Sequence, residues 1–555
     1  MRKKNEIVPL TITGMTAEGN GVGRIEGEAV FVPRTAVGDK LQCRIVKAMP
    51  TYAFGIIEQL EEPSLDRIQP DCPVYASCGG CAFRHMTYQA ECAVKQQVVE
   101  DAFVRIGGLH PVFLPILGCD TPTGYRNKAQ YPVGMQNGQA VCGFYAKRSH
   151  RIVPYTHCAL QPPLFSEILE AALEHIRQQG LQPYDEQRGT GLLRHLYLRQ
   201  GYHSGEVMLC FVVTRSAREQ LMPLSQQLQH RFSQLTSICM NVNPARTNVI
   251  LGKRTETLLG QAEIRDTMCG IRVELSPHAF YQVNTAQAER LYGIAREFAQ
   301  LDGSQSLLDL YCGTGTIGLS MADGVKHLTG VEVIPQAVEN AIRNARENRI
   351  ENADFHVGDA AQWAQQLAQR GEHPDVIVLD PPRKGCDAQT LEAVCRMAPQ
   401  RIVMISCNPA TAARDCALLD KLGYYARKVQ AVDLFPRTGH VETVVLLSHK
   451  KPDGHINVKV EFGEGEGKVP LDNIAKRAEE YKPKERVTYK MIKEYIEAKY
   501  GFKVHTAYIA EVKRDLGLPM YDAPNAVEEL KQPRKHPTAE KVEAIKDALK
   551  HFEVI

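Results

Sequence analysis

Cys407 stands where an apolar segment gives way to a loop. Residues 402–405 are Ile-Val-Met-Ile, a run typical of a buried strand, and Asn408-Pro409 ends it. In an open parallel sheet, ligands bind in the crevice beyond the carboxyl ends of the strands. A thiol at that position can attack a bound ligand. The alternative is a core cysteine, because free cysteines are among the most buried residues.

Four other cysteines have a spacing suited to a metal group. Cys72, Cys78 and Cys81 follow the pattern Cys-x5-Cys-x2-Cys, with glycines at 79 and 80, and Cys158 can supply a fourth thiolate. Four cysteines bind either zinc or a [4Fe–4S] cluster, and the spacing alone does not distinguish the two. We therefore expect these four residues to hold a metal group.

A glycine-rich loop follows a second apolar segment, residues 307–311. The loop spans 312–318, Cys-Gly-Thr-Gly-Thr-Ile-Gly, and its glycines let the backbone approach a ligand just before a helix. About 20 residues further on, the next strand ends in Glu332, where a carboxylate can accept hydrogen bonds from ribose hydroxyls. A third strand ends at Asp359, a candidate partner for an adenine amino group. The pattern predicts a nucleoside ligand.

The loop also meets the Gly-x-Gly-x-x-Gly spacing of nicotinamide-binding proteins. Its position deep in the chain opposes that interpretation. So does the strand that follows at 376–379, which ends in Asp380-Pro381-Pro382-Arg383. Such a corner favours an S-adenosylmethionine-dependent methyltransferase that acts on planar bases.

The composition is that of a globular protein. The 555 residues leave room for roughly three or four domains, and the formal charge of +2 argues against a protein that is basic throughout. We find no secretory signal and no apolar run near the ~20 residues that span a bilayer. We therefore expect a cytoplasmic protein without a membrane partner, in which clustered cysteines bind metal or act in catalysis.

Apolar patterning divides the chain into four regions. Short strands and glycines over 1–62 predict a small β-barrel, whose basic residues either contact RNA or form a solvated surface. Residues 63–275 predict a mixed α/β region with the cysteines, expected to bind RNA, and 276–450 a doubly wound parallel sheet. Residues 451–555 predict a linker at 461–468 and helices near 484–500, 506–516 and 538–552, whose role the sequence does not reveal.

The chain resembles the RNA uracil-5-methyltransferases over roughly residues 5–448. Five motifs carry the resemblance: Phe280-Tyr-Gln-Val-Asn284, the loop from Asp309 to Gly315, Asp380-Pro-Pro-Arg383, Ser406-Cys-Asn-Pro409 and Gly439-His-Val-Glu-Thr443. Within that family, the front barrel (a TRAM domain) and the cysteines resemble the 23S ribosomal RNA branch. The transfer RNA branch normally lacks both.

The resemblance implies an α/β fold. Its parts would be a class I (Rossmann-like) methyltransferase domain, an OB-like TRAM barrel, a mixed central domain and a helical C-terminal extension. Cys407 would add to C6 of a uridine, and Glu442 would remove the C5 proton. Gln282, Tyr311, Glu332, Asp359 and Asp380 would line the S-adenosylmethionine pocket. Arg126 is a weaker candidate for orienting the base or its phosphate.

The resemblance also favours a structural [4Fe–4S] cluster over zinc at the four cysteines. We expect a monomer that methylates a uridine of 23S ribosomal RNA. The alternatives are the same reaction on transfer RNA and an inactive RNA-binding assembly factor. A radical S-adenosylmethionine enzyme is opposed by the first cysteine gap, which is five residues where that class has three.

Overall fold

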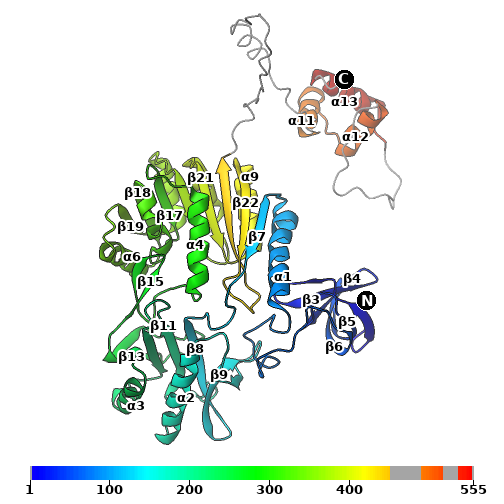
Figure 1. Cartoon of the computed structure of the whole chain (residues 1–555). Helices are drawn as coiled ribbons and strands as arrows, with labels where there is room; N and C mark the ends of the chain where they lie inside the picture. Colours follow the sequence, from blue (N-terminus) through cyan, green and yellow to red (C-terminus); the bar gives the residue numbers. More distant parts are fainter. Residues whose placement is uncertain (1–2, 450–488, 517–535, 553–555) are drawn as a thin grey trace, which may run out of the picture. The chain divides into compact units, whose positions relative to one another are not determined.

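The structure is a computed structural model that describes residues 3–449, 489–516 and 536–552 (Figure 1). The chain divides into two compact units, Met1–Gly454 and His455–Ile555. The segment 461–468, predicted to be a linker, lies outside the described residues. No helix within the described ranges is long and apolar enough to cross a membrane.

The N-terminal strands form a six-stranded sheet of order β1-β5-β6-β4-β3-β2. Its strands are β1 (Ile7–Thr11), β2 (Gly14–Met15), β3 (Asn20–Ile25), β4 (Glu28–Pro33), β5 (Lys40–Ala48) and β6 (Tyr52–Glu62). The Thr13 N–H donates to the Val22 carbonyl at 2.8 Å, so the chain after β1 returns to β3 and the sheet curls. Leu10, Val30, Leu41 and Ile45 fill the interior.

The central region is a seven-stranded sheet of order β10-β9-β8-β11-β12-β13-β14. Strands β11 and β12 at its centre pair in antiparallel fashion. Helices α2 (Pro163–Gln178) and α3 (Arg218–Arg231) pack on one face. The strands are β8 (Lys128–Gln136), β9 (Gln139–Tyr145), β10 (Ile152–Pro154), β11 (Leu193–Gln200), β12 (Val207–Val213), β13 (Leu235–Val242) and β14 (Arg254–Gly260), followed by a hairpin of β15 (Ile264–Met268) and β16 (Ile271–Leu275).

The third sheet has eight strands in the order β19-β18-β17-β20-β21-β23-β22-β7. The first five strands in this order, β19, β18, β17, β20 and β21, are parallel to one another. Strand β23 runs antiparallel to both β21 and β22. Seven of the strands are β17 (Ser306–Leu310), β18 (His327–Glu332), β19 (Ala353–Val357), β20 (Val376–Leu379), β21 (Arg401–Ser406), β22 (Tyr424–Val432) and β23 (Glu442–His449). The predicted doubly wound sheet is confirmed.

Helices cover both faces of this sheet, because alternate strand residues point to opposite faces. Val376 and Val378 pack with α4 and α6, whereas Ile377 and Leu379 pack with α7, α8 and α9. The helices are α4 (Thr285–Ala299), α5 (Thr316–Leu319), the 3-10 turn η2 (Ala322–Gly324), α6 (Pro335–Glu347), α7 (Ala360–Gln369), α8 (Ala388–Arg396) and α9 (Pro409–Lys421).

A segment from before the central sheet completes the third sheet. Helix α1 (Tyr88–Asp101) continues into a π-helical turn, η1 (Ala102–Gly107), and then into β7 (Val112–Leu117). Strand β7 pairs in parallel with β22 at the edge of the sheet, and α1 lies beside it (Figure 1). Part of the range that we assigned to the cysteine and central region therefore belongs structurally to this sheet.

The second unit contains the predicted helices as α11 (Tyr489–Tyr500), α12 (Thr506–Asp515) and α13 (Ala539–His551). They share a small core that includes Ile496, Ile509 and Ile545. The start that we predicted for the first of these helices, residues 484–488, lies outside the described residues.

Candidate active site

The register of β21 and β23 brings Cys407 and Glu442 together. Ser406, the last residue of β21, pairs with Thr443 in this antiparallel ladder, so Cys407 follows one member of the pair and Glu442 precedes the other. The Thr443 hydroxyl donates to the Ser406 carbonyl at 3.1 Å and holds the end of the ladder. The predicted nucleophile and the predicted base therefore lie side by side at one edge of the sheet.

Asp380 joins them from the neighbouring strand. Leu379 pairs with Met404 in the parallel ladder of β20 and β21, which places Asp380 at the same edge. Burial raises the pKa of Asp380 to about 7. The pKa of Glu442 rises to about 8, first because the side chain is buried and second because the Asp380 charge repels its own, while Arg383 opposes the rise. Each of these two carboxyl groups therefore has a pKa near neutral pH.

The Cys407 thiol is half-buried, and burial raises its pKa. The charges of Glu442 and Asp380 raise this pKa further, whereas Arg383 lowers it through its charge and a hydrogen bond. Arg383 was part of a motif in the sequence, but we assigned it no role there. The structure shows it as the cation that favours the reactive thiolate.

A cavity opens beside Cys407, and four parts of the chain line it. Its volume is about 410 Å³. Arg383, Cys407 and His440 come from the third sheet, and Lys147 comes from the loop after β9. Segments 17–18 of the N-terminal sheet and 79–82 of the cysteine region complete the wall. The pKa of His440 is lowered by burial, so its imidazole is neutral near pH 7.

The glycine loop has the conformation that a close ligand requires. Gly313 and Gly315 have φ values of +56° and +79°, a backbone conformation that residues with a side chain rarely adopt. A Cβ at Gly315 would lie 3.0 Å from the Phe355 ring, and one at Gly318 would lie 2.9 Å from Asp309 Oδ2. The loop is therefore packed from behind and depends on glycine at these positions.

Two carboxylates lie against this loop. Asp309 is fully buried, and its Oδ2 accepts a hydrogen bond from the Gly318 N–H at 3.0 Å. Its Oδ1 has no partner among the described residues, and burial raises its pKa to about 8. Glu332 accepts hydrogen bonds from the N–H groups of Gly313, at 3.2 Å, and Ile334, at 2.9 Å. An unpartnered buried oxygen is a feature of a site that a polar ligand completes.

The other predicted cofactor residues differ in their surroundings. The Gln282 side chain interacts with Tyr292 of α4, a buried tyrosine that also faces Thr316 and the charge of Asp380. Helical periodicity made Tyr292 look like an ordinary core residue, so the sequence carried no signal for it. Tyr311 has a left-handed backbone, with φ +68°. Its side chain interacts with Thr390 and Cys386.

Asp359 already has a structural task. Its Oδ1 accepts hydrogen bonds from the N–H groups of Ala361 and Gln362, both at 3.1 Å, so it caps α7. Capping groups of this kind stabilise a helix start. The side chain is nonetheless exposed at the carboxyl end of the sheet.

The four predicted metal-binding cysteines surround one cavity of about 280 Å³. Arg84, Arg126 and Lys128 line the same cavity, and Gly80 and Cys81 also line the cavity of Cys407. Within the described residues, no three His, Cys, Asp or Glu side chains form a group that could hold a metal ion. The four cysteines therefore line one cavity, but their sulfur atoms do not converge on a single metal-binding position.

These features define a class of protein: an S-adenosylmethionine-dependent methyltransferase with an added N-terminal sheet. Residues 194–450 match the tRNA (uracil-5-)-methyltransferase family, and residues 2–57 match the TRAM domain. An uncharacterized RNA methyltransferase of Halalkalibacterium halodurans is 42% identical over 448 residues, which are 80% of this chain and 98% of that protein. One of Listeria monocytogenes is 41% identical, with the same coverage. The chain belongs to the RNA (uracil-5-)-methyltransferase family, and the predicted resemblance is confirmed at that level.

A solved structure agrees with this assignment. The tRNA (uracil-54, C5)-methyltransferase of Pyrococcus abyssi, in complex with S-adenosyl-L-homocysteine, has a TM-score of 0.63 to this chain. It is 25% identical, and the match covers 79% of this chain and 100% of that one. The chain is therefore an S-adenosylmethionine-dependent enzyme with a TRAM domain. The comparisons do not distinguish ribosomal from transfer RNA.

Proposed function

We propose that the enzyme methylates C5 of a uridine in 23S ribosomal RNA through a covalent adduct with Cys407. The observation that carries this proposal is the closeness of Cys407 and Glu442, which adjoin the last pair of the β21–β23 ladder, Ser406 and Thr443, beside a cavity of about 410 Å³. A nucleophile and a base on adjacent strands can reach the two faces of one small ring. Uracil C5 is too weakly nucleophilic to react without such help.

Cys407 performs the first step. Its thiolate adds to C6 of the uracil, and the electron pair of the C5–C6 double bond moves toward the C4 carbonyl as an enolate. S-Adenosylmethionine, when bound, supplies a methyl group on a positively charged sulfur, which C5 can accept. Arg383 helps this step because its charge favours the thiolate.

Glu442 performs the second step. It takes the proton from C5, the electron pair re-forms the C5–C6 double bond, and the bond from C6 to the Cys407 sulfur breaks. A carboxylate of ordinary acidity is a weak base, but a pKa of about 8 makes Glu442 a stronger one. The thiolate is regenerated, and one proton is released in the whole reaction.

The chain's own residues fit a bound S-adenosylmethionine. The unpartnered Oδ1 of Asp309 and the left-handed glycines of the loop are the features of the structure that support this fit. In our proposal, the cofactor-binding residues are Gln282, Tyr311, Glu332, Asp359 and Asp380. Glu332 would accept from ribose hydroxyls, and Asp359 from the adenine amino group through its second oxygen.

We infer that Cys72, Cys78, Cys81 and Cys158 hold a [4Fe–4S] cluster with a structural role. Zinc bound at about 2.3 Å would draw four sulfur atoms to within about 4 Å of one another, whereas these thiols surround a cavity of about 280 Å³. The Nε atoms of Arg84 and Arg126 are buried without hydrogen-bond partners. Lys128, whose pKa is lowered to about 8 by burial and by neighbouring arginines, lines the same cavity. These cations suit an anionic cluster.

The resemblance of the cysteines and barrel to the ribosomal RNA branch supports 23S ribosomal RNA as substrate. Transfer RNA is the second candidate, because the Pyrococcus abyssi neighbour is a tRNA (uracil-54, C5)-methyltransferase. Transfer of labelled methyl groups to transcripts of both RNAs distinguishes them. We expect 5-methyluridine in the 23S transcript only, and label in tRNA alone would overturn the substrate.

The covalent step has its own test. RNA carrying 5-fluorouridine should remain attached to the enzyme in denaturing gels, because fluorine cannot leave as a proton does. The adduct should map to Cys407 by mass spectrometry, and Cys407→Ala should form none while still binding S-adenosylmethionine. For the cluster, anaerobic preparations should contain iron and sulfide. Zinc without iron would refute that part of the proposal.

A further inference from the structure

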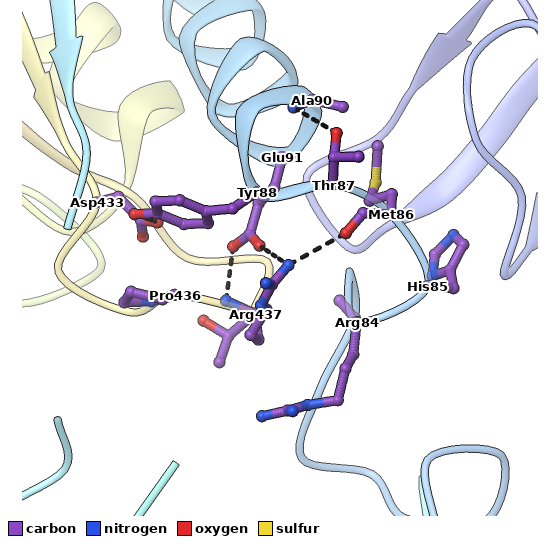
Figure 2. Close-up of polar contacts among 12 residues, drawn as sticks. Arg84, His85, Met86, Thr87, Tyr88, Ala90, Glu91, Asp433, Pro436 and Arg437 are labelled. Atoms are coloured by element: carbon purple, nitrogen blue, oxygen red, sulfur yellow. Dashed lines mark hydrogen bonds and ion pairs between the residues drawn. The ribbon is translucent and has the colours of Figure 1, made fainter. Parts of the chain in front are cut away.

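The segment that leads into Glu442, residues 433–441, is tied to α1 by buried charges (Figure 2). Lys95 of α1 donates from Nζ to Asp433 Oδ1 at 2.7 Å and to the Phe435 carbonyl at 3.2 Å. The same ammonium donates to Glu91 Oε1 at 2.8 Å. Lys95 is 2% exposed, and Glu91 and Asp433 are 0% exposed.

Arg437 forms the second half of this network. Its N–H donates to Glu91 Oε1 at 2.6 Å, and its guanidinium reaches Glu91 and the Met86 carbonyl (Figure 2). Its backbone is left-handed, with φ +69°, a conformation that non-glycine residues hold only where the surroundings impose it. The surroundings do so here, because its carbonyl accepts the N–H groups of Ala82, at 2.8 Å, and Phe83, at 3.2 Å.

Further contacts fix the same segment from other sides. The Tyr88 hydroxyl donates to Asp433 Oδ2 at 2.8 Å and accepts from the Cys119 N–H at 2.7 Å. The Tyr125 hydroxyl donates to the Pro436 carbonyl at 2.9 Å. Gly439 is so close to the Ala17 carbonyl of the N-terminal sheet that a Cβ would collide with it. The segment therefore has little freedom.

The chemistry begins where this segment ends. Thr438 and His440 line the cavity of Cys407, and Glu442 is the first residue of β23. A buried ion pair is weak evidence for stability, because apolar residues of similar volume often stabilise a fold as well or better. What directed charges do supply is a fixed geometry. Here that geometry fixes the approach of the chain to the catalytic carboxyl.

We propose that Lys95 is a positioning residue for Glu442, acting through Asp433 and the 433–441 segment. The proposal rests on the function argued above. Without the Lys95 ammonium, two buried carboxylates repel each other and the Phe435 carbonyl loses a donor. The segment then shifts, and Glu442 moves relative to C5 of the bound uracil. Cys407 follows the last residue of β21 and makes none of these contacts.

The proposal predicts which step fails. Addition of Cys407 and receipt of the methyl group continue, but removal of the C5 proton slows. The methylated adduct, in which Cys407 is still bonded to C6, then persists. A residue that served only general stability would not produce this species.

Lys95→Met is the main test, because it keeps the length of the side chain and removes its charge. With ordinary uridine RNA, we expect kcat to fall by about a hundredfold, as a displacement near 1 Å can cause. The KM for RNA and the affinity for S-adenosylmethionine should stay within about threefold of wild type. Denaturing gels should show a protein–RNA adduct that carries the transferred methyl group, which wild type does not accumulate.

Two further variants secure the interpretation. Tyr88→Phe removes one tie to Asp433 without changing charge, and it should give the same adduct with a kcat loss of about tenfold. Arg343→Met breaks a partly buried ion pair with Glu263, at 3.0 Å, on α6 and outside this network. It should lower the thermal midpoint without adduct or loss of kcat.

Each result decides one question. If Lys95→Met folds and binds both ligands but shows wild-type turnover, or loses kcat without the adduct, the positioning role is wrong. If it does not fold, Tyr88→Phe decides in the same way. Trapping by 5-fluorouridine RNA separates this outcome from the proposed function, because it needs Cys407 and S-adenosylmethionine but no removal of a proton from C5. It should proceed at the wild-type rate in both variants, and failure to trap in wild type would overturn the covalent mechanism instead.

Discussion

Glu442 and Asp380 lie close enough to interact through their charges, and neither carboxyl has the acidity it would have in water. The pKa values of about 8 and about 7 follow chiefly from burial, since desolvation penalises the charged form. Near neutral pH these two carboxyl groups therefore hold their protons more tightly than solvent-exposed carboxyl groups do. The raised pKa suits Glu442 to its proposed role as the base that takes a proton from carbon.

The same burial has a consequence for folding. Because the folded-state pKa of Glu442 lies above the ordinary value of 4.5, the folded protein binds its proton more tightly than the unfolded chain does. Stability from this group is complete below pH 4.5 and is lost as the pH rises toward 8. Glu442→Gln, which stays neutral, should therefore stabilise the protein at pH 7 by on the order of 3 kcal/mol.

Thermal or denaturant unfolding at pH 5 and pH 8 checks this prediction. The gain from Glu442→Gln should be small at pH 5 and larger at pH 8. Asp323→Asn is the matched control, because the pKa of Asp323 is lowered by its pairing with Arg296 and its charge favours folding. That substitution should not stabilise the protein at pH 8. An equal effect of Glu442→Gln at both pH values would contradict the raised pKa.

Arg383 lowers the pKa of both Cys407 and Glu442, and both must lose a proton to act. Arg383→Met should raise both pKa values and move the rising limb of the pH–rate profile to higher pH. The rate of 5-fluorouridine trapping should drop about tenfold at pH 7 and recover in part at pH 9. Lys384→Met, which removes the neighbouring exposed cation, should leave the limb in place. A uniform loss at every pH would show that Arg383 acts on RNA binding alone.

At the scale of elements, the sequence predicts what local pattern determines. Apolar runs followed by Gly, Asp or Asn-Pro locate β17, β18, β20 and β21 closely, because these strands are buried on both faces and end at the ligand side. Glu332, Asp380 and Cys407 were found as site candidates for this reason. The spacing after the glycine loop suggested the ribose role of Glu332, whereas the detailed roles of Asp380 and Cys407 came from the family motifs.

Contacts between segments that are distant in the sequence could not be predicted in this way. Strand β7 pairs with β22 about 300 residues later in the sequence, and the six residues of β7 do not indicate which strand it pairs with. Lys95 looks like an ordinary helix cation, yet it is buried against Asp433. A charged residue is buried only when a partner arrives from elsewhere in the fold, so the composition of α1 could not reveal it.

The glycine loop permits a prediction at this scale. Gly315→Ala places a Cβ on a left-handed residue, 3.0 Å from the Phe355 ring, and should cost about 1–3 kcal/mol unless the loop shifts. A shifted loop leaves the position where the ligand binds. Calorimetry should show affinity for S-adenosylmethionine lowered about tenfold or more.

Gly371→Ala is the control for strain alone. Gly371 also has a positive φ, +72°, but a Cβ there would meet nothing within 4 Å. This variant should lose some stability and keep the wild-type affinity. If both variants bind equally well, the loop tolerates a side chain and does not carry the cofactor in the manner proposed.

At the scale of the whole molecule, the cavity beside Cys407 is a product of assembly. The N-terminal sheet, the cysteine region, the loop after β9 and the third sheet each contribute part of its wall. Under the proposed function, a uridine reaches the Cys407 thiol where these four parts meet, so RNA recognition and chemistry share one surface. The segment 433–441 touches three of these parts and links their positions to Glu442.

The second unit lies outside the matched family regions and has a core of its own. The matched family regions end at residue 450, and relatives that align over 98% of their own length cover 80% of this chain. The unit has its own small core of Ile496, Ile509 and Ile545. A chain ending at Gly454 should therefore methylate RNA with kcat and KM within about threefold of the full chain. Single-turnover and steady-state assays on the same transcript check this, and a loss beyond about tenfold would place the extension among the parts that the reaction needs.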